Sequence, residues 1–241
     1  PIPAEVKLRD GSLWKNQTTE EVSKVAETLN EFRGRYRYNL MDHNVRAMSS
    51  EIAQIWQWDD HEVTNNYSDS KNLASNTAYT EKNVQLLAAR GQRAFMEYAP
   101  MRTFGTVEHQ RIYRVLPQGP LADIFVIDMR SYRGPNSANL QTIESAETDF
   151  IGRPQMAWLL QGLQQSTATW KIIAADMPIG LFVPDGKDAE GRNQWEAIAN
   201  GEHGTPKGRE LEMARLLKGI KDAKIKNVVW LTADVHYTAA H

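Results

Sequence analysis

The sequence predicts an α/β fold, and three observations support that prediction. Apolar runs of strand length alternate along the chain with segments whose apolar residues recur at helical spacing. Two of these runs, at 122–128 and 170–175, lack polar alternation, which is typical of strands covered on both faces. The chain has 241 residues, of which 41% are hydrophobic, enough to bury a sizeable core. A chain of this length fits one large domain or two small ones, and we take residues 1–241 as a single domain.

The first half of the chain is predicted to be mainly helical. Residues 19–32 form the first expected helix, which Thr18 or Thr19 would cap and which the glycine at position 34 would end or bend. Shorter and longer helices are expected at 45–53 and 83–98. Between them, the apolar and aromatic residues 55–58 indicate a short strand. Residues 68–80, rich in Ser, Asn and Asp, indicate a loop.

Strands and helices alternate in the second half. Strands are expected at 111–116, 122–128, 170–175 and 227–232, and helices at 155–165 and 208–222. Residues 186–208 carry charges, glycines and a proline, so we expect a long insertion or lid there.

Composition and motifs exclude several classes of protein. The formal net charge is −2, so no overall basic field favours nucleic acid or acidic membranes. No apolar run approaches the ~18 residues of a membrane span. Alternating Arg and Tyr residues at 33–38 superficially suggest stacking on nucleic acid, but a solvated structural segment is the preferred interpretation. The chain also lacks a phosphate-binding loop, a Gly-x-Ser-x-Gly elbow and cysteine.

Polar residues collect where three apolar runs end. The first run delivers Asp59, Asp60, His61 and Glu62, the second delivers Asp176, and the third delivers Asp234 and His236. In open α/β sheets, sites lie beyond the carboxyl ends of the strands, so these segments can converge on one crevice.

Aspartate and histidine are ligands for divalent and trivalent cations, and two cations a few Å apart can bind a phosphate and activate water. A histidine beside them could protonate the leaving alkoxide. Each residue also has a structural interpretation. Asp176 could form a turn or cap a helix, and His236 could be a hydrogen-bonded structural residue. The acidic cluster at 59–62 is harder to explain structurally, because it needs positive charge to neutralise it.

Five motifs, in order, resemble the alkaline phosphatase D-like phosphoesterases, and the resemblance spans about residues 28–240. They are Trp58-Asp59-Asp60-His61-Glu62-Val63 with Asn65-Asn66; residues 94–102; residues 122–133; Gln155 to Lys171; and Thr232-Ala233-Asp234-Val235-His236-Tyr237. The resemblance implies a calcineurin-like metallophosphoesterase with a four-layer αββα sandwich. The early metal motifs and the last strands of that family are not found, so we expect a fragment, incomplete at both ends and inactive by itself.

The resemblance also implies roles for single residues. His61 would assist the leaving group as general acid. The metal ligands would be Asp60, Asp176, Asp234 and His236. Asp59 and Asn65 would contact the substrate.

The family consists of exported enzymes that hydrolyse phosphomonoesters or phosphodiesters with iron and calcium. This implies a periplasmic or extracellular hydrolase with two or more metal ions, Ca²⁺ and Fe³⁺. The aspartate-rich set suits a hard cation such as Ca²⁺. The alternative is a non-catalytic binding or surface protein that keeps the fold with an incomplete metal site.

Overall fold

The computed structural model describes residues 1–103, 111–236, 238 and 240. The chain divides into two compact units. The helical unit comprises Pro1–Trp56 and Asn72–Gln110, and the sheet unit comprises Gln57–Lys71 and Arg111–His241. No described helix is both long and apolar enough to cross a membrane.

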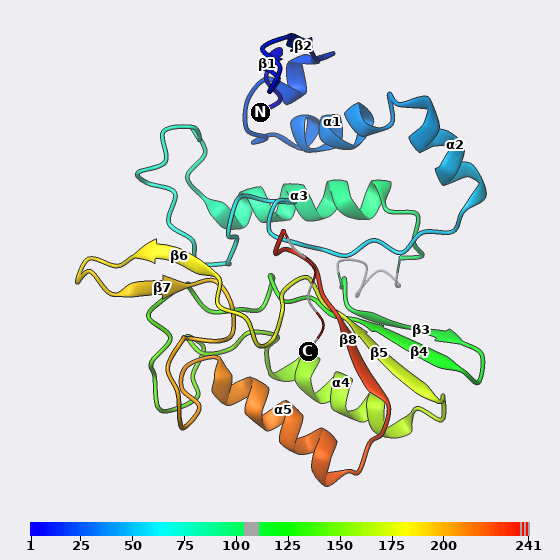
Figure 1. Cartoon of the computed structure of the whole chain (residues 1–241), viewed down its shortest axis with the longest axis vertical. Coiled ribbons are helices and arrows are strands. Elements are labelled where there is room, and N and C mark those ends of the chain that lie inside the picture. The colour runs from blue at the N-terminus through cyan, green and yellow to red at the C-terminus, as the bar shows by residue number, and fades with distance from the viewer. Residues whose placement is uncertain (104–110, 237, 239, 241) are drawn as a thin grey trace. The chain divides into compact units, whose positions relative to one another are not determined.

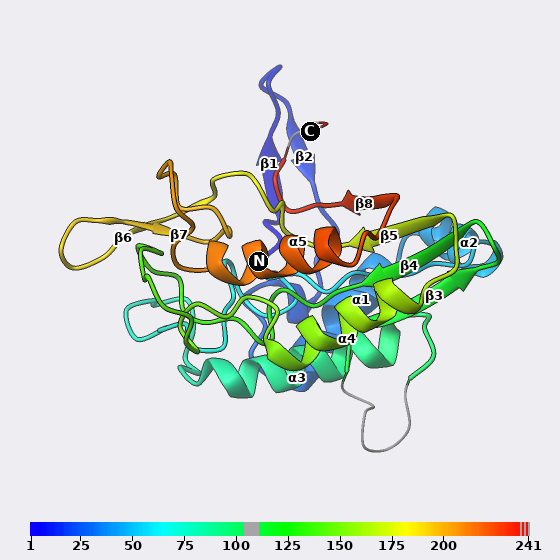
Figure 2. The same ribbon diagram turned by 90° about the horizontal axis from the view of Figure 1, so that it is seen from below.

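The helical unit contains a short hairpin followed by helices (Figures 1 and 2). Its elements are β1 (Glu5–Lys7), β2 (Leu13–Lys15), the 3-10 helix η1 (Glu20–Val22), α1 (Leu29–Asn39), α2 (His43–Glu51) and α3 (Val84–Tyr98). Strands β1 and β2 pair antiparallel. Helices α1 and α3 pack on each other, with the rings of Tyr36 and Tyr98 stacked at a centroid distance of 5.2 Å.

The first helix lies further along the chain than predicted. Instead of a helix at 19–32, a single 3-10 turn precedes α1, which begins after Thr28. Thr28 and Glu31 form a capping box: the Thr28 hydroxyl accepts from the Glu31 amide, and the Glu31 carboxylate accepts from the Thr28 amide. The helix then continues through Gly34, where a Cβ atom would lie 2.3 Å from Cβ of Glu21. The glycine therefore permits a close approach and does not end the helix.

The remaining predictions for the helical unit have mixed outcomes. Helices α2 and α3 are confirmed, and each begins at a side-chain cap. Asp42 accepts from two amides of α2, and Asn83 accepts from the Leu86 amide of α3. The predicted strand at 55–58 is wrong, because these residues pair with no described strand. Their apolar and aromatic character comes from side-chain packing: the ring of Trp56 stacks on that of Tyr36.

The sheet unit is an α/β arrangement, as predicted. Its elements are β3 (Arg114–Gln118), β4 (Ala122–Val126), α4 (Arg153–Gln165), β5 (Trp170–Ala174), β6 (Pro184–Lys187), β7 (Asn193–Trp195), α5 (Glu210–Asp222) and β8 (Val228–Leu231). The main sheet has the order β3-β4-β5-β8. Strands β4, β5 and β8 are parallel, and β3 pairs antiparallel with β4. All four strands occur within a few residues of their predicted positions.

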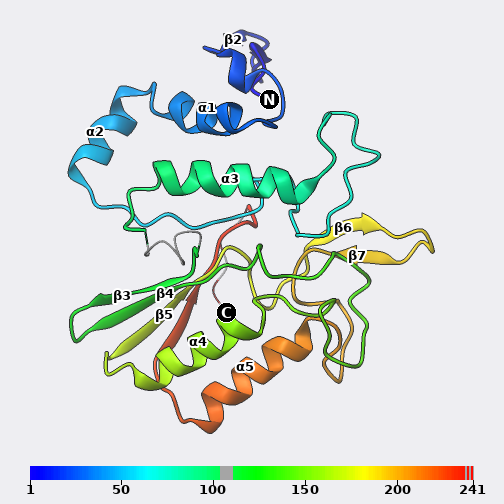
Figure 3. The ribbon, with the colours of Figure 1, turned by 180° about the vertical axis from the view of Figure 1, so that it is seen from behind.

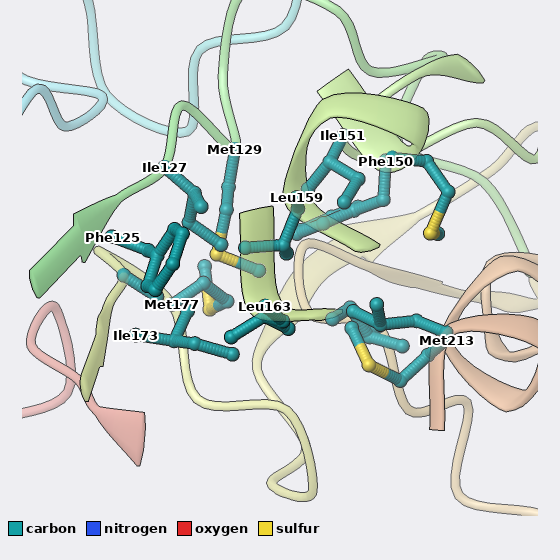
Figure 4. Close-up of a cluster of buried hydrophobic side chains, with 14 of the residues drawn as sticks. Phe125, Ile127, Met129, Phe150, Ile151, Leu159, Leu163, Ile173, Met177 and Met213 are labelled. Atoms are coloured by element: carbon teal, nitrogen blue, oxygen red, sulfur yellow. The ribbon is translucent and has the colours of Figure 1, made fainter. Parts of the chain in front are cut away.

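Helices α4 and α5 pack side by side against one face of this sheet (Figures 1 and 3). The core between them contains Phe125 of β4, Ile173 of β5 and Leu159 of α4 (Figure 4). Gly162 lets α4 approach β4, because a Cβ atom there would lie 2.7 Å from the ring of Phe125. On the other face of β8, Leu231 is exposed. The main sheet of the sheet unit is therefore covered by one helical layer, formed by α4 and α5.

The predicted insertion contains a two-stranded hairpin. Strands β6 and β7 pair antiparallel and form a separate two-stranded sheet (Figure 1). The Trp195 amide at the end of β7 donates to the Ser137 carbonyl, which fixes the hairpin to the loop between β4 and α4. The next residue, Glu196, thereby lies on a segment that is anchored to the rest of the unit.

Parallel pairing places the carboxyl ends of β4, β5 and β8 at one edge of the sheet. Backbone hydrogen bonds continue beyond the strands at this edge. The Ile127 amide donates to the Ala174 carbonyl, and the Ala233 amide donates to the Asp176 carbonyl. The loops that follow the three strands are therefore held close together. They carry Arg130, Asp176 and Asp234.

Candidate metal centre

The segment that contains the acidic run lies beside this edge of the sheet. The Gln57 side-chain amide donates to the Ile127 carbonyl at 2.7 Å, which fastens the segment to the end of β4. Trp58 is buried, and the Asp60 carbonyl accepts from the amides of Val63 and Thr64 to form a turn. The turn holds Asp59 and Asp60 at the edge of the sheet.

Three carboxylates meet there. Asp59, Asp60 and Asp234 each offer an oxygen, and the three oxygens lie within 4.8 Å of one another. Asp234 adopts a φ of 64°, a left-handed conformation that aspartate tolerates better than most residues, so the chain turns sharply after β8. We call these three residues the carboxylate cluster. It brings together acidic residues that are far apart in the sequence.

Asp60 is the most buried member of the cluster, with 2% of its surface exposed. Its Oδ2 accepts from the Asn66 amide, while its buried Oδ1 has no hydrogen-bond partner. A buried carboxylate oxygen without a partner is costly, and a bound cation is one of the few groups that would offset this cost.

Arg130 is the centre of a wider network of ion pairs. Its side chain is fully buried. Its Nε lies 2.5 Å from Asp176, and its Nη2 lies 2.8 Å from Asp59 and 3.2 Å from Asp234. Its Nη1 donates to Glu196. One guanidinium thus contacts four carboxylates, which come from four separate segments of the sheet unit.

A short turn after β4 positions this arginine. The Asp128 carboxylate accepts from the backbone amides of Arg130 and Ser131, both at 2.9 Å. Gln155 of α4 also holds this turn, because its side chain accepts from the Asp128 amide and donates to the Asp128 carbonyl. These hydrogen bonds hold the backbone turn from which the Arg130 side chain reaches the carboxylates.

The network carries more negative than positive charge. Burial raises the pKa of Asp176 to about 7, although the Arg130 guanidinium opposes this shift. Burial likewise raises the pKa values of Glu196 and Asp234 above their usual range. For Arg130 itself, burial disfavours the charge, but attraction by Asp176 and Glu196 raises its pKa. Buried Arg133 also attracts Glu196 and Asp176, whereas Arg130 is the cation that contacts Asp59 and Asp234. The carboxylate cluster therefore favours a further cation.

The other predicted site residues lie at different distances from the cluster. His61 is exposed, and its Nε2 lies 3.9 Å from Oδ2 of Asp60. His236 is exposed and does not belong to the carboxylate cluster. Asn65 is exposed, and its side-chain amide donates to that of Asn66 at 2.8 Å. The roles predicted for these three residues stay predictions. Tyr237, which closes the last motif, lies outside the described residues.

The chain is similar to known proteins in sequence and in structure. A family model described as PhoD-like phosphatase matches residues 2–241. The chain belongs to the PhoD-like phosphatase family. This PhoD-like chain is similar to alkaline phosphatase D of Bacillus subtilis (strain 168), with 27% identity over 244 residues. The alignment covers 97% of the chain and 39% of that relative.

A solved structure of PhoD is also similar, with a TM-score of 0.65 and 27% identity. It covers 88% of the chain and 40% of the solved chain. The PhoD-like chain thus spans about two fifths of the length of the relatives it matches. The predicted family and the metallophosphatase-type fold are both confirmed.

The sequence interpretation assigned no role to two residues of this PhoD-like site, Arg130 and Glu196. A signal for Arg130 was present, because it lies four residues after the end of the largely apolar strand β4. Glu196 gave no such signal, since the 186–208 segment carries many charges. The backbone contacts of Trp195 and of Glu196 itself, with Ser137 and Val183, place Glu196 next to Arg130.

A second network joins the hairpin to the acidic segment. Asn66 donates to one carboxylate oxygen of Asp185 in β6, and Asn136 donates to the other at 2.7 Å. Asn66 has a φ of 52°, and its backbone amide also donates to Asp60. Asn66 therefore positions Asp60 and is itself held by the hairpin.

The raised pKa of Asp176 predicts a pH dependence of stability without metal. The Asp176 carboxyl has its ordinary pKa of 3.8 in the unfolded state and a pKa of about 7 in the folded state. The folded protein therefore loses stability as the pH rises between these two values. The full change is about 4 kcal/mol by the relation between pKa and free energy. We expect chemical denaturation in chelator to show a lower free energy of unfolding at pH 8 than at pH 5.

Asp176→Asn should make this dependence less steep without removing it, because burial raises the pKa values of Glu62, Glu196 and Asp234 in the same direction. The exposed Asp222→Asn should not change it. An equally steep pH dependence in Asp176→Asn would assign the effect to other groups.

Proposed function

We propose that the protein hydrolyses phosphate esters with bound cations at the carboxylate cluster. One observation carries the proposal: the buried, unpartnered Oδ1 of Asp60 lies in a group whose other members, Asp59 and Asp234, offer oxygens within 4.8 Å. Membership of the PhoD-like phosphatase family gives the reaction class. The chain covers 39% of its curated relative, so the activity of the whole protein is part of this proposal.

The donor set fits a hard cation. The cluster consists of carboxylate oxygens, the ligands that Ca²⁺ prefers. Asp176 has a second buried Oδ1 without a hydrogen-bond partner, while its Oδ2 contacts Arg130. We assign Asp60 and Asp234 as ligands, as the sequence predicts, and add Asp59. Asp176 and His236, together with the identity of the ions as Ca²⁺ and Fe³⁺, stay within the proposal on the family resemblance.

Cations bound there would supply positive charge to stabilise the phosphoryl group in the transition state. The chain's own residues then perform the remaining tasks. Asn66 keeps Asp60 in place, and the Arg130 network keeps Asp59 and Asp234 in place. His61 lies at the exposed side of Asp60, where its imidazole can donate a proton to the leaving alkoxide oxygen.

The substrate is a small phosphate ester in this proposal, with Asn65 as an exposed hydrogen-bonding group nearby. Monoesters and diesters both suit the residues present. We further propose, on the family resemblance, that the protein acts in the periplasm or outside the cell.

Two measurements on the full-length protein test the proposal. We expect hydrolysis of an aryl phosphate that a chelator abolishes and added Ca²⁺ restores. We also expect elemental analysis of the purified protein to find two or more tightly held ions. A protein that holds no ion and hydrolyses no ester would instead support the alternative of a non-catalytic binding protein.

A further inference from the structure

We propose that Arg130 is a built-in counter-cation of the metal centre: it holds the metal ligands together when no metal is bound, and it lowers their affinity for the metal. The inference rests on the proposed function, because it concerns the cation that the carboxylate cluster would bind. It assigns Arg130 a positioning role and an electrostatic role.

The contacts of the guanidinium support this role. It has five N–H donors in a rigid planar fork, and it directs them to Asp59, Asp176, Glu196 and Asp234. A surface salt bridge involves one pair, whereas here one cation gathers carboxylates from four segments, much as a metal ion does. Because the side chain is fully buried, water does not screen these contacts.

Two of its partners, Asp59 and Asp234, also belong to the carboxylate cluster. Nη2 of Arg130 donates to Oδ1 of both residues. A cation in the cluster would therefore share ligands with the arginine. Arg130 fixes the orientation of both carboxylates before the cation binds, and it also places a positive charge close to the cation.

The charges decide which effect dominates metal affinity. Removing a buried positive charge a few Å from a cation site should strengthen cation binding by roughly 10- to 100-fold, even with a moderate effective dielectric constant. Loss of orientation acts in the opposite direction. However, carboxylates that have lost the guanidinium between them repel one another more strongly, and this repulsion favours cation binding further. We therefore expect the electrostatic effect to be larger.

The test compares Arg130→Met and Arg130→Lys in the full-length protein, with Ca²⁺ alone as the probe. Thermal unfolding is measured in chelator and in CaCl₂, and Ca²⁺ affinity is measured by calorimetry. Arg130→Met should unfold at a much lower temperature in chelator, regain most of the loss in CaCl₂, and bind Ca²⁺ about 10- to 100-fold more tightly. Arg130→Lys keeps the charge but not the fork, so it should lose stability in chelator without tighter Ca²⁺ binding.

Arg192→Met is the matched control, since Arg192 is exposed and pairs only locally with Asp188 and Glu190. This variant should change neither the unfolding temperature nor the Ca²⁺ affinity. If Arg130→Met does not fold in chelator, its recovery in CaCl₂ is the expected result. Failure to recover in CaCl₂, while Arg130→Lys folds, overturns the inference.

The outcomes separate this inference from the proposed function. If the wild-type protein binds Ca²⁺ and Arg130→Met binds it no more tightly, Arg130 is only a structural residue and the inference alone fails. If neither protein binds Ca²⁺, both the metal centre and the counter-cation role fail. If Arg130→Met alone binds Ca²⁺, the inference holds, and the arginine blocks the site in the wild-type protein.

Discussion

Asp60→Ala is expected to reduce turnover of an aryl phosphate by about 10³-fold in the full-length protein. Losing several kcal/mol of charge stabilisation by a bound cation has an effect of this size. Asp60 should be sensitive because it is the buried member of the cluster and its Oδ1 has no other partner. The measurement is the initial rate at saturating substrate, with Ca²⁺ affinity determined on the same sample.

Asp60→Asn separates charge from coordination. The amide keeps an oxygen that can accept from the Asn66 amide and bind a cation weakly. We therefore expect a loss about 10-fold smaller than for the alanine variant, as for a weakened and not a missing ligand. Asp69→Asn, at an exposed position in the same segment, is the control. Normal turnover and Ca²⁺ affinity in Asp60→Ala would remove the carboxylate cluster from the mechanism.

Apolar pattern was sufficient to locate the strands of the sheet unit, because their core-facing residues are apolar. In strand β5, Ile173 is buried in the core beside α4, although Trp170 at the start of the strand is exposed. The helical unit was harder to predict, because short-range capping decided where α1 begins. Residues 19–32 contain helical spacing throughout, but the capping box of Thr28 and Glu31 stabilises a later start.

The candidate site was predictable to the extent that strand ends identify it. Asp176 and Asp234 follow β5 and β8, and the parallel pairing of these strands brings the loops after them together. Asp60 follows an apolar segment that is not a strand, and the hydrogen bond from Gln57 to Ile127 holds that segment at the sheet edge. The ion pairs between side chains of the site were not predictable from the sequence. The pairing of Arg130 with Glu196 depends on how the β6–β7 hairpin is anchored, and neighbouring residues in the sequence carry no information about that contact.

His61→Ala is expected to reduce turnover by ~10²–10⁴-fold for esters of poor leaving groups, the usual range for loss of acid–base assistance. A phenolate or alkoxide needs a proton as it departs, whereas a nitrophenolate is stable without one. The loss should therefore be large for alkyl and phenyl phosphates and much smaller for nitrophenyl phosphate. Steady-state rates for this substrate series, measured for both proteins, give the dependence on the leaving group.

The exposure of His61 makes this experiment interpretable. Its side chain is 73% exposed, so alanine leaves no cavity and the protein should unfold at the same temperature as the wild type. His203→Ala is the matched control, because His203 is also exposed in the sheet unit and lies outside the candidate site. An equal loss for all leaving groups would assign His61 to phosphate binding, since only a proton donor distinguishes among the departing oxygens.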